Sequence, residues 1–563
     1  MNIHPLLSRR LARAAFALLL AASATTSLVR PALAKDDLTI GITQYPVTLH
    51  PSIESMLAKT YVLDMTRRPF TAYDKDWQLV CMLCVTLPTI ENGLAKIESL
   101  PGGKKGIAVT YTIQPKATWG DGVPLTTKDV LFSYEVGKHP QSGVTSGEMY
   151  RRILKIDVKD DKTFTMHMDR VTFDYNAIND FNVLPEHLER ARFADPAAYR
   201  SRNGYDTDTT NPGLYFGPYK IVEKAVGSHI VLEPNPTWWG KPPYFKRIVV
   251  RAIENTSALE ANLLSGSVDY IAGELGLTLD QAIPFEKRHA GQYNILYKPS
   301  LTYEHIDLNL DNPILQDKRV RQALILGIDR EAISKQLFDG RQAVASSMVN
   351  PLDWVYDPAT PSYARDPAKA AALLDAAGWT LKAKGGIRAN AKGEPLMLEF
   401  MTTAANKTRE QVQQVLQSQW RQLGIDVRIR NEPARVFFGE TMTKRRYGAL
   451  AMYAWYSAPE SVPRTTLHSS QIPTAENNFA GQNYPGFSDP AVDALLDSIE
   501  SELDRAKRKA LWSKLQAAYA DDLPVIPLFF RADPYIFPKW LKDIEPTGHQ
   551  DISTLWVENW SAQ

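Results

Sequence analysis

The chain has 563 residues, of which 44% are hydrophobic and 23% charged, and its formal net charge at pH 7 is +1. A chain of this length can build more than one lobe with a substantial core, and its near-neutral charge argues against a nucleic-acid partner. Beyond the N-terminal segment no apolar run is long enough to cross a membrane, so we do not expect the protein to form a channel.

The N-terminal segment has the pattern of a secretory signal peptide. Three arginines precede an apolar run at residues 14–22, and residues 32–34 (Ala-Leu-Ala) supply small side chains for cleavage. The apolar run is well short of the roughly 20 residues that span a bilayer, and no cysteine follows it for lipid attachment. We therefore expect a signal peptide over residues 1–34 and a soluble protein secreted to the periplasm.

The two cysteines, Cys81 and Cys84, are separated by Met-Leu. A redox site of the thioredoxin type needs a helix N-terminus after the pair, whereas residues 85–88 are expected to be extended. Without a neighbouring histidine, two cysteines are also too few for a tetrahedral zinc site. A short structural disulfide formed after export and a pair of free buried thiols both fit the pattern, and a redox role is disfavoured.

Residues 76–211 contain more turns than the rest of the chain. Residues 153–168 alternate on either side of a charged turn and predict a β-hairpin. Thr126 and Asp129 have the spacing of a capping box at the start of a helix. Trp119, in a Gly-rich turn, is expected to pack in the interior rather than to contact a ligand. This part of the chain is interpreted as a β-rich subdomain inserted into a larger lobe.

A β-α-β pattern follows the subdomain. Buried-type strands at residues 246–253 and 268–273 flank a helix at residues 258–264, which Thr256 or Ser257 can cap. A parallel or mixed sheet covered by helices is expected from this pattern.

A second β-α-β pattern lies in the other half of the chain. Strands at residues 396–400 and 425–430 flank a long amphipathic helix that begins after Asn406 and ends near Leu423. Together the two patterns predict two α/β lobes.

A series of segments carries a resemblance to a known family. The most informative is residues 111–135, a strand, a Trp-Gly-Asp-Gly turn and a capped helix. The others, in chain order, are 217–223, 235–248, 317–340, 366–379, 423–429 and 522–530. This order resembles the bacterial extracellular solute-binding proteins of the peptide/nickel type, family 5, which include the oligopeptide- and dipeptide-binding components of ABC importers.

The resemblance implies an α/β, bilobal periplasmic-binding-protein fold with an inserted β-rich subdomain in the first lobe. The expected divisions are 35–75, 212–300 and 530–563 for the first lobe, 76–211 for the subdomain and 301–529 for the second lobe. Extended crossings near residues 303–309 and 526–531 would form a hinge that lets the lobes close on a solute. The implied partners are permease and ATPase subunits of an importer, with the binding protein itself a monomer.

A strand end in the second lobe is expected to face the ligand. Trp455, Tyr456 and Ser457 follow one another there, and the first two must point to opposite sides of the strand. Of the two, Trp455 is the one expected to point into the cleft. This segment resembles the one in which oligopeptide-binding members of the family place an aspartate that holds the peptide ammonium. At the corresponding position this chain has Ala458. Glu460 is the nearest carboxylate that can replace that aspartate.

Further candidate ligand contacts lie in both lobes. Arg464 can meet a ligand carboxylate, although an ion pair within the protein is the alternative. Asn478 belongs to a polar loop whose amides can bond a peptide backbone or sugar hydroxyls. Gln44 and Tyr45 follow a strand end in the first lobe, which is a common position at a cleft.

The sequence contains none of the common nucleophile, metalloprotease, P-loop or dinucleotide motifs. We therefore expect a binding protein, not an enzyme, with no metal or cofactor, that captures a peptide-sized ligand. A non-peptide solute such as an oligosaccharide, opine, metal complex or haem is the first alternative. An exported hydrolase with unrecognised catalytic residues is the second.

Overall fold

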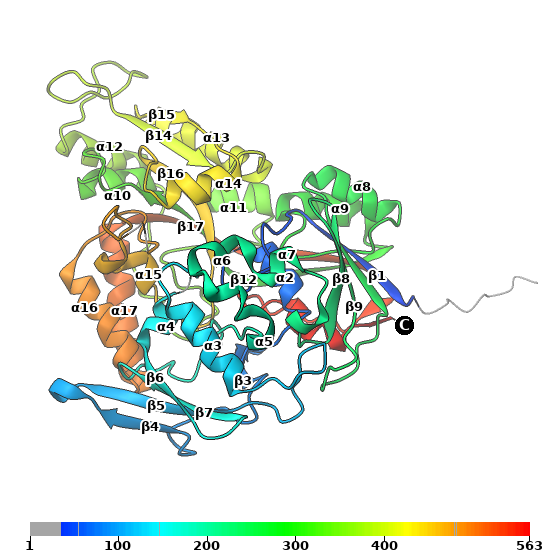
Figure 1. The fold of residues 1–563 in the computed structure, drawn as a ribbon. Helices are drawn as coiled ribbons and strands as arrows, with labels where there is room; N and C mark the ends of the chain where they lie inside the picture. The colour runs from blue at the N-terminus through cyan, green and yellow to red at the C-terminus, as the bar shows by residue number, and fades with distance from the viewer. Residues whose placement is uncertain (1–34, 55, 146, 478, 480, 563) are drawn as a thin grey trace, which may run out of the picture.

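The computed structural model describes residues 35–54, 56–145, 147–477, 479 and 481–562. The expected signal peptide and the candidate Asn478 lie outside these residues. The described part folds around a large mixed sheet, a smaller antiparallel sheet and helices that cover them (Figure 1). No helix in this part is both long and apolar enough to cross a membrane.

One continuous sheet runs through the larger part of the molecule. In spatial order its strands are β15 (Asp426–Ile429), β14 (Met397–Thr402), β16 (Leu450–Tyr456), β12 (Tyr293–Leu308), β17 (Val525–Pro538), β11 (Tyr270–Ile271), β1 (Asp37–Ile42), β10 (Arg247–Ala252), β9 (His229–Pro234) and β8 (Tyr219–Ala225). A short strand, β13 (Ala343–Val344), pairs with β17 off this path.

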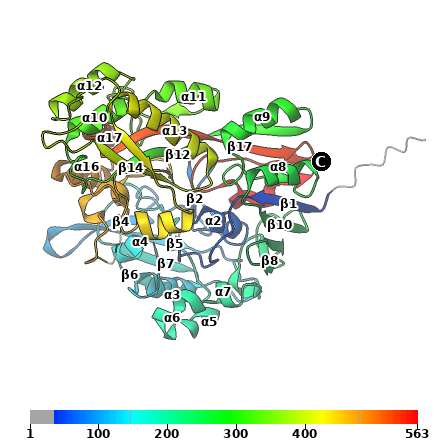
Figure 2. The same cartoon turned by 90° about the horizontal axis from the view of Figure 1, so that it is seen from above.

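The long strands β12 and β17 connect the two halves of this sheet. They pair antiparallel from Tyr293 opposite Pro538 to Asp307 opposite Val525, and the register breaks between Pro299 and Tyr303. Extended crossings are thus present where the sequence predicted them. Figures 1 and 2 show helices α8 (Thr256–Leu264) and α9 (Leu279–His289) at one end, and α10 (Lys318–Leu326) and α12 (Pro367–Ala376) at the other.

In the first half, β1 lies between β10 and β11 and runs parallel to both. The predicted β-α-β unit is therefore present with a third strand inserted between its two strands. The helix that connects them, α8, is capped by the side chain of Asn255, which accepts a hydrogen bond from the backbone N–H of Ala258. The prediction of Thr256 or Ser257 as the cap was wrong, because these residues already belong to the helix.

In the second half, β14 and β15 pair directly and parallel, with α13 (Lys407–Gln422) between them in the chain. Asn406 caps α13 through its side chain, as predicted. Helices α10, α11 (Arg330–Phe338) and α12 pack with this sheet around the buried ring of Trp420. Two further helices, α16 (Pro490–Ser501) and α17 (Arg505–Asp522), build a separate cluster around Trp512.

The turn-rich segment forms its own four-stranded antiparallel sheet in the order β4 (Ala95–Ser99), β5 (Lys105–Thr112), β7 (Thr163–Met168) and β6 (Ile153–Val158). The predicted hairpin is β6 and β7, and the predicted capping box of Thr126 and Asp129 begins α3 (Thr127–Lys138). Trp119 is fully buried against Phe216, in agreement with a packing role. The fold is thus the expected α/β bilobal architecture with a β-rich insertion.

Short elements complete the described chain. They are α2 (Leu57–Leu63), α4 (Gly147–Arg152), α5 (Glu186–Glu189), α6 (Pro196–Arg202), α7 (Gly204–Thr207), α14 (Ala434–Val436), α15 (Arg464–Leu467), β2 (Thr71–Tyr73), β3 (Leu79–Cys81), β18 (Leu541–Lys542) and β19 (Ser561–Ala562).

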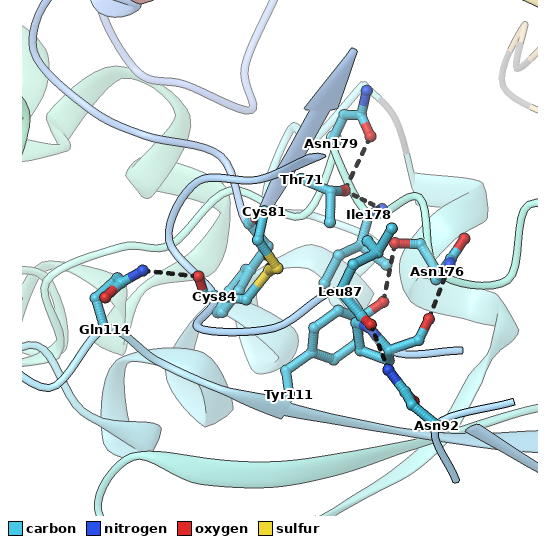
Figure 3. The surroundings of a disulfide bond; sticks show 12 residues. Thr71, Cys81, Cys84, Leu87, Asn92, Tyr111, Gln114, Asn176, Ile178 and Asn179 are labelled. Carbon is cyan, nitrogen blue, oxygen red and sulfur yellow. Dashed lines mark hydrogen bonds between the residues drawn. A yellow bond between two sulfur atoms is a disulfide. The ribbon is translucent and has the colours of Figure 1, made fainter. Parts of the chain in front are cut away.

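Cys81 and Cys84 form a disulfide, with their Cα atoms 5.2 Å apart. Figure 3 shows the bond beside the short hairpin of β2 and β3, in which Cys81 lies opposite Thr71. The Thr71 hydroxyl in turn donates a hydrogen bond to Oδ1 of Asn179 at 3.1 Å. Of the two possibilities left by the sequence, the structure contains the disulfide.

Candidate functional site

Two backbone hydrogen bonds connect the second lobe to the rest of the molecule, one near the C-terminus and one from the inserted subdomain. The backbone N–H of Gln550, near the C-terminus, donates to the carbonyl oxygen of Ser457 at 3.2 Å. On the subdomain side, the N–H of Phe173 donates to the carbonyl of Glu500 on α16 at 2.8 Å. The guanidinium of Arg508 lies 4.3 Å from the centre of the Phe173 ring. These contacts define a closed arrangement of the lobes.

Trp455 and Tyr456 end β16 at this boundary and face opposite sides, as their alternation requires. Tyr456 packs against the hydrophobic cluster of the first half, and its buried hydroxyl has no hydrogen-bond partner in the described chain. Trp455 instead stacks on Tyr484, with ring centres 6.1 Å apart, and stays with the aromatic cluster of the second half. Tyr456 is therefore the side chain that reaches toward the opposite lobe.

Ser457 and Ala458 lie at the boundary and line a small cavity of about 20 Å³. The same cavity is lined by Asp353, which is 8% exposed. Burial raises the pKa of Asp353, and its Oδ2 accepts a hydrogen bond from the N–H of Glu460 at 2.7 Å. A carboxylate thus lies close to Ala458 after all, although it comes from a distant part of the chain.

Glu460 is held inside the second lobe. Its carboxylate pairs with the guanidinium of Arg508 and accepts a hydrogen bond from the indole N–H of Trp354 at 2.9 Å. Burial raises the pKa of Glu460, while Arg508 acts in the opposite direction. Since Arg508 already supplies a positive charge, this carboxylate is less suited to a ligand ammonium than the sequence alone indicated.

Arg464 is also paired within the protein. Its Nε lies 2.7 Å from Oε1 of Glu500, and its guanidinium contacts Asp497 on the same helix. The side chain is 16% exposed. The arrangement corresponds to the alternative given for this residue, an ion pair rather than a free group for a ligand carboxylate.

Gln44 and Tyr45 follow β1 in the first lobe. Gln44 is exposed, and Tyr45 packs beside the same hydrophobic cluster that Tyr456 contacts. The hydroxyl of Tyr45 is buried and has no hydrogen-bond partner among the described residues, and burial raises its pKa. The structure thus brings Tyr45 and Tyr456 to one cluster, while Glu460 and Arg464 are held elsewhere by partners of their own.

A polar cavity of about 190 Å³ between α2 and the inserted subdomain was not anticipated from the sequence. Four of its lining residues are carboxylic acids: Glu54, which pairs with Arg200, and Asp64, Asp180 and Asp551. Burial raises the pKa of Asp64 to about 7 and that of Asp551 to about 8. These residues come from three distant segments, so only the tertiary fold brings them together. No local motif signals such a group.

In the described part of the chain, no group of three or more His, Cys, Asp or Glu side chains is arranged to hold a metal ion. The carboxylates of Glu460, Asp353 and Asp551 are held by an arginine and by backbone N–H groups. Such groups can recognise the polar and charged parts of an organic solute.

Two lobes joined by a pair of continuous strands, with aromatic and carboxylate side chains at their boundary, define the class of bilobal solute-binding proteins. The model of the family "bacterial extracellular solute-binding proteins, family 5 Middle" matches residues 97–474. The chain belongs to this family, as the order of its motifs indicated.

Relatives cover most of the chain. The oligopeptide-binding protein AppA of Bacillus subtilis is 26% identical over 475 residues, which cover 83% of each protein. The nickel-binding periplasmic protein of Escherichia coli is 22% identical over 524 residues and 92% of this chain. The crystal structure of an oligopeptide-binding protein from Thermus thermophilus with a pentapeptide has a TM-score of 0.83 at 29% identity, covering 94% of this chain and 96% of that one.

Proposed function

We propose that this protein is the solute-binding component of an ABC importer and that it captures a peptide-sized ligand between its lobes for delivery to a membrane permease. The observation that carries the proposal is the paired crossing of β12 and β17, beside which Tyr456 and Ser457 meet the opposite lobe. Two strands that pass between the same two bodies form a hinge, and closure about a hinge can enclose a solute.

A peptide is favoured as the ligand because the family and the relatives named for oligopeptides cover most of the chain. The nickel-binding relative keeps a non-peptide solute as the second candidate. We propose Tyr456, Ser457, Tyr45 and Gln44 as ligand contacts and retain Trp455 at the cleft edge. Asn478 remains a proposal from the sequence, and Glu460 and Arg464 are proposed only if their ion pairs open on ligand binding.

The remaining assignments follow from this role. The divisions at residues 75, 211, 300 and 529 are proposed as domain boundaries, and residues 1–34 as a signal peptide that directs the chain to the periplasm. The proposed partners are permease and ATPase subunits, and the proposed state is a monomer. Catalysis is not part of the proposal, because binding and closure are sufficient for delivery.

Native mass spectrometry of protein purified without denaturation tests the function directly. A retained mass that fragments as a peptide supports the peptide assignment. A thermal-shift panel of peptides, oligosaccharides and metal complexes provides the second measurement, since a ligand bound only by the folded state stabilises it by RT ln(1 + [L]/Kd). Turnover of a panel member without retention would favour the hydrolase, and stabilisation by a non-peptide solute alone would favour the second candidate.

A further inference from the structure

The polar cavity between α2 and the subdomain has the size of a subsite rather than of a complete ligand pocket. Its volume is about 190 Å³, whereas pockets that enclose a whole small molecule span roughly 300 to 1,000 Å³. One wall is formed by α2 and the residues after it, and the others by residues 179–182 and 550–555. We call it the acid-lined cavity, after Asp64, Asp180 and Asp551.

Asp64 is a carboxylic acid in the wall of the acid-lined cavity without a partner among the described residues. It is 4% exposed, and in the described part of the chain its carboxylate accepts no hydrogen bond and has no cation within ion-pair distance. The charges of Arg67 and Arg68 act on it from further away, but burial dominates and raises its pKa. A buried carboxylate without a partner is costly, so its position in a cavity wall points to a group that is brought in from outside.

Asp551 is partly satisfied. Its Oδ2 accepts hydrogen bonds from the backbone N–H of Tyr73 at 2.7 Å and from Nδ2 of Asn179 at 3.2 Å. Asp64 and Asp180 raise its pKa further after the effect of burial. Asp64 and Asp180 therefore disfavour the ionised form of Asp551, and a cation placed beside it would relieve this repulsion.

Of the two cations that line the cavity, Lys59 is committed to other groups and Arg67 only in part, because the buried Nε of Arg67 has no hydrogen-bond partner among the described residues. The Lys59 ammonium donates to the backbone carbonyls of His50, Pro51, Ile53 and Glu54. The guanidinium of Arg67 donates to the side-chain oxygen of Asn182.

One guanidinium and one ammonium thus face Asp64, Asp180 and Asp551, while the fourth carboxylate, Glu54, pairs with Arg200. When Asp64, Asp180 and Asp551 are ionised, the wall has an excess of negative charge, and a positively charged group that favours their ionised forms is its electrostatic complement.

The acid-lined cavity adjoins the boundary between the lobes. Gln550, which lines it, is the residue whose N–H contacts the carbonyl of Ser457 in the second lobe. We propose that the cavity receives an organic cation, an ammonium or guanidinium group, that belongs to the solute held between the lobes. The inference rests on the proposed function and names the charge of the preferred solute. The cation can come from a peptide α-amine or from a lysine or arginine side chain.

A set of matched pentapeptides separates these sources. One series carries a single lysine at each position in an otherwise alanine peptide, and its partner series carries norleucine instead. Both series are prepared with a free and an acetylated N-terminus, and isothermal titration calorimetry gives each Kd. If the cation is a side chain, we expect the lysine peptide to bind at least about 10-fold more tightly than its norleucine partner at one position. If it is the α-amine, we expect the free-amine peptide to bind more tightly than its acetylated partner by the same factor.

Variants tie this preference to the cavity. Asp64→Asn and Asp551→Asn, singly and together, keep the side-chain shape and should remove the preference for the cationic peptide while leaving the neutral peptide nearly unchanged. Asp161→Asn, which removes a charge from an exposed turn of the subdomain hairpin, is the matched control and should keep the preference. Thermal unfolding of each variant shows whether it is folded.

The outcomes separate the two proposals. Equal Kd values for cationic and neutral peptides in the parent protein would overturn the inference and leave peptide binding intact. A preference for the cationic peptide that survives in the double variant would have the same meaning. If no pentapeptide binds, the peptide assignment fails, and methylguanidinium alone then tests the cavity. A thermal shift with methylguanidinium in the parent but not in the double variant would support the inference, and no shift in either would overturn it.

Discussion

Glu304 and Arg531 form an ion pair across the two strands that join the lobes. Glu304 lies on β12 and Arg531 on β17, and the Nε of Arg531 donates to Oε2 of Glu304 at 3.0 Å. Arg409 on α13 donates to the other carboxylate oxygen at 2.6 Å. A single carboxylate, 6% exposed, thus holds two arginines at the crossing.

Removing this carboxylate is expected to destabilise the protein. Glu304→Gln leaves two guanidinium groups without their counter-charge, and breaking a buried pair costs roughly 3 to 5 kcal/mol. Denaturant unfolding measures the loss. Glu399→Gln is the matched control, since Glu399 pairs with Arg430 where both side chains are more exposed, and should cost less than about 1 kcal/mol. Equal losses in both variants would contradict the special role of the crossing.

The same carboxylate predicts an acid-dependent loss of stability. Despite burial, Arg409 and Arg531 lower the pKa of Glu304 from 4.5 to about 2. The folded state therefore binds this proton less readily than the unfolded state, so the stabilisation is complete above pH 4.5 and is lost as pH falls toward 2. Unfolding curves between about pH 5 and pH 2.5 should have a shallower dependence on pH in Glu304→Gln than in the parent.

The acid-lined cavity predicts that stability decreases as pH rises toward and beyond neutral, which is opposite to the effect of Glu304. Burial raises the pKa of Asp551 from 3.8 to about 8, so the folded state holds a proton that the unfolded state releases. The ligand-free protein should lose stability as pH rises between these values, at up to about 1.4 kcal/mol for each pH unit. The groups around Asp551 are the N–H of Tyr73 and the side chains of Asn179, Asp64, Asp180 and Arg67.

Asp551→Asn isolates this contribution, because the asparagine oxygen can still accept from Tyr73. The melting temperature of the variant should exceed that of the parent at about pH 8, and the difference should shrink steadily as the pH falls toward 3.8. Comparing the two proteins at each pH removes the effect of other groups, including Lys59, whose pKa burial lowers to about 7. A difference that does not depend on pH would contradict the raised pKa.

The Cys81–Cys84 disulfide is expected to contribute modestly to stability. It closes a loop of only four residues, for which the chain-entropy relation gives about 2 kcal/mol. The double variant Cys81→Ser/Cys84→Ser should lose about this amount in denaturant unfolding. Reductant should lower the stability of the parent by a similar amount and leave the variant unchanged, whereas an equal effect of reductant on both would show that it acts elsewhere.

Glu460 distinguishes a structural from a ligand-binding role. Because Arg508 pairs with its carboxylate, we expect Glu460→Gln to lower the free energy of unfolding by on the order of 3 kcal/mol and to change the affinities for free-amine and N-acetylated peptides equally. Calorimetry with such a peptide pair provides the measurement. A loss of about 10-fold confined to the free-amine peptide would instead restore the hypothesis that Glu460 binds the ammonium.

Features that depend on neighbouring residues could be predicted from the sequence. The capping box of Thr126 and Asp129 and the cap at Asn406 are local patterns, and both are present in the structure. The cap of α8 was predicted at Thr256 or Ser257, one or two residues too late, because Asn255 precedes them and all three types of side chain can cap a helix. Only the backbone conformation at each position decides which of them does.

The candidate site was less accessible to sequence reasoning. The segment around Tyr456 could be chosen from its resemblance to relatives, but its partners could not. Arg508 meets Glu460, and Asp353 lies near Ala458, through packing between distant segments. The acid-lined cavity likewise depends on charges that approach one another only after folding, and nothing in the sequence around Asp551 indicates its neighbours.

The place of β17 in the sheet also determines the order in which the molecule can assemble. It lies between β12 and β11 and pairs with both, so the described sheet consists of two separate pieces until residues 525–538 have been synthesised. Most of the chain must therefore be made before the lobes can be joined, and this late strand completes both at once. A truncation before Val525 would remove the connection itself, leaving two half-sheets with unpaired edges prone to aggregation.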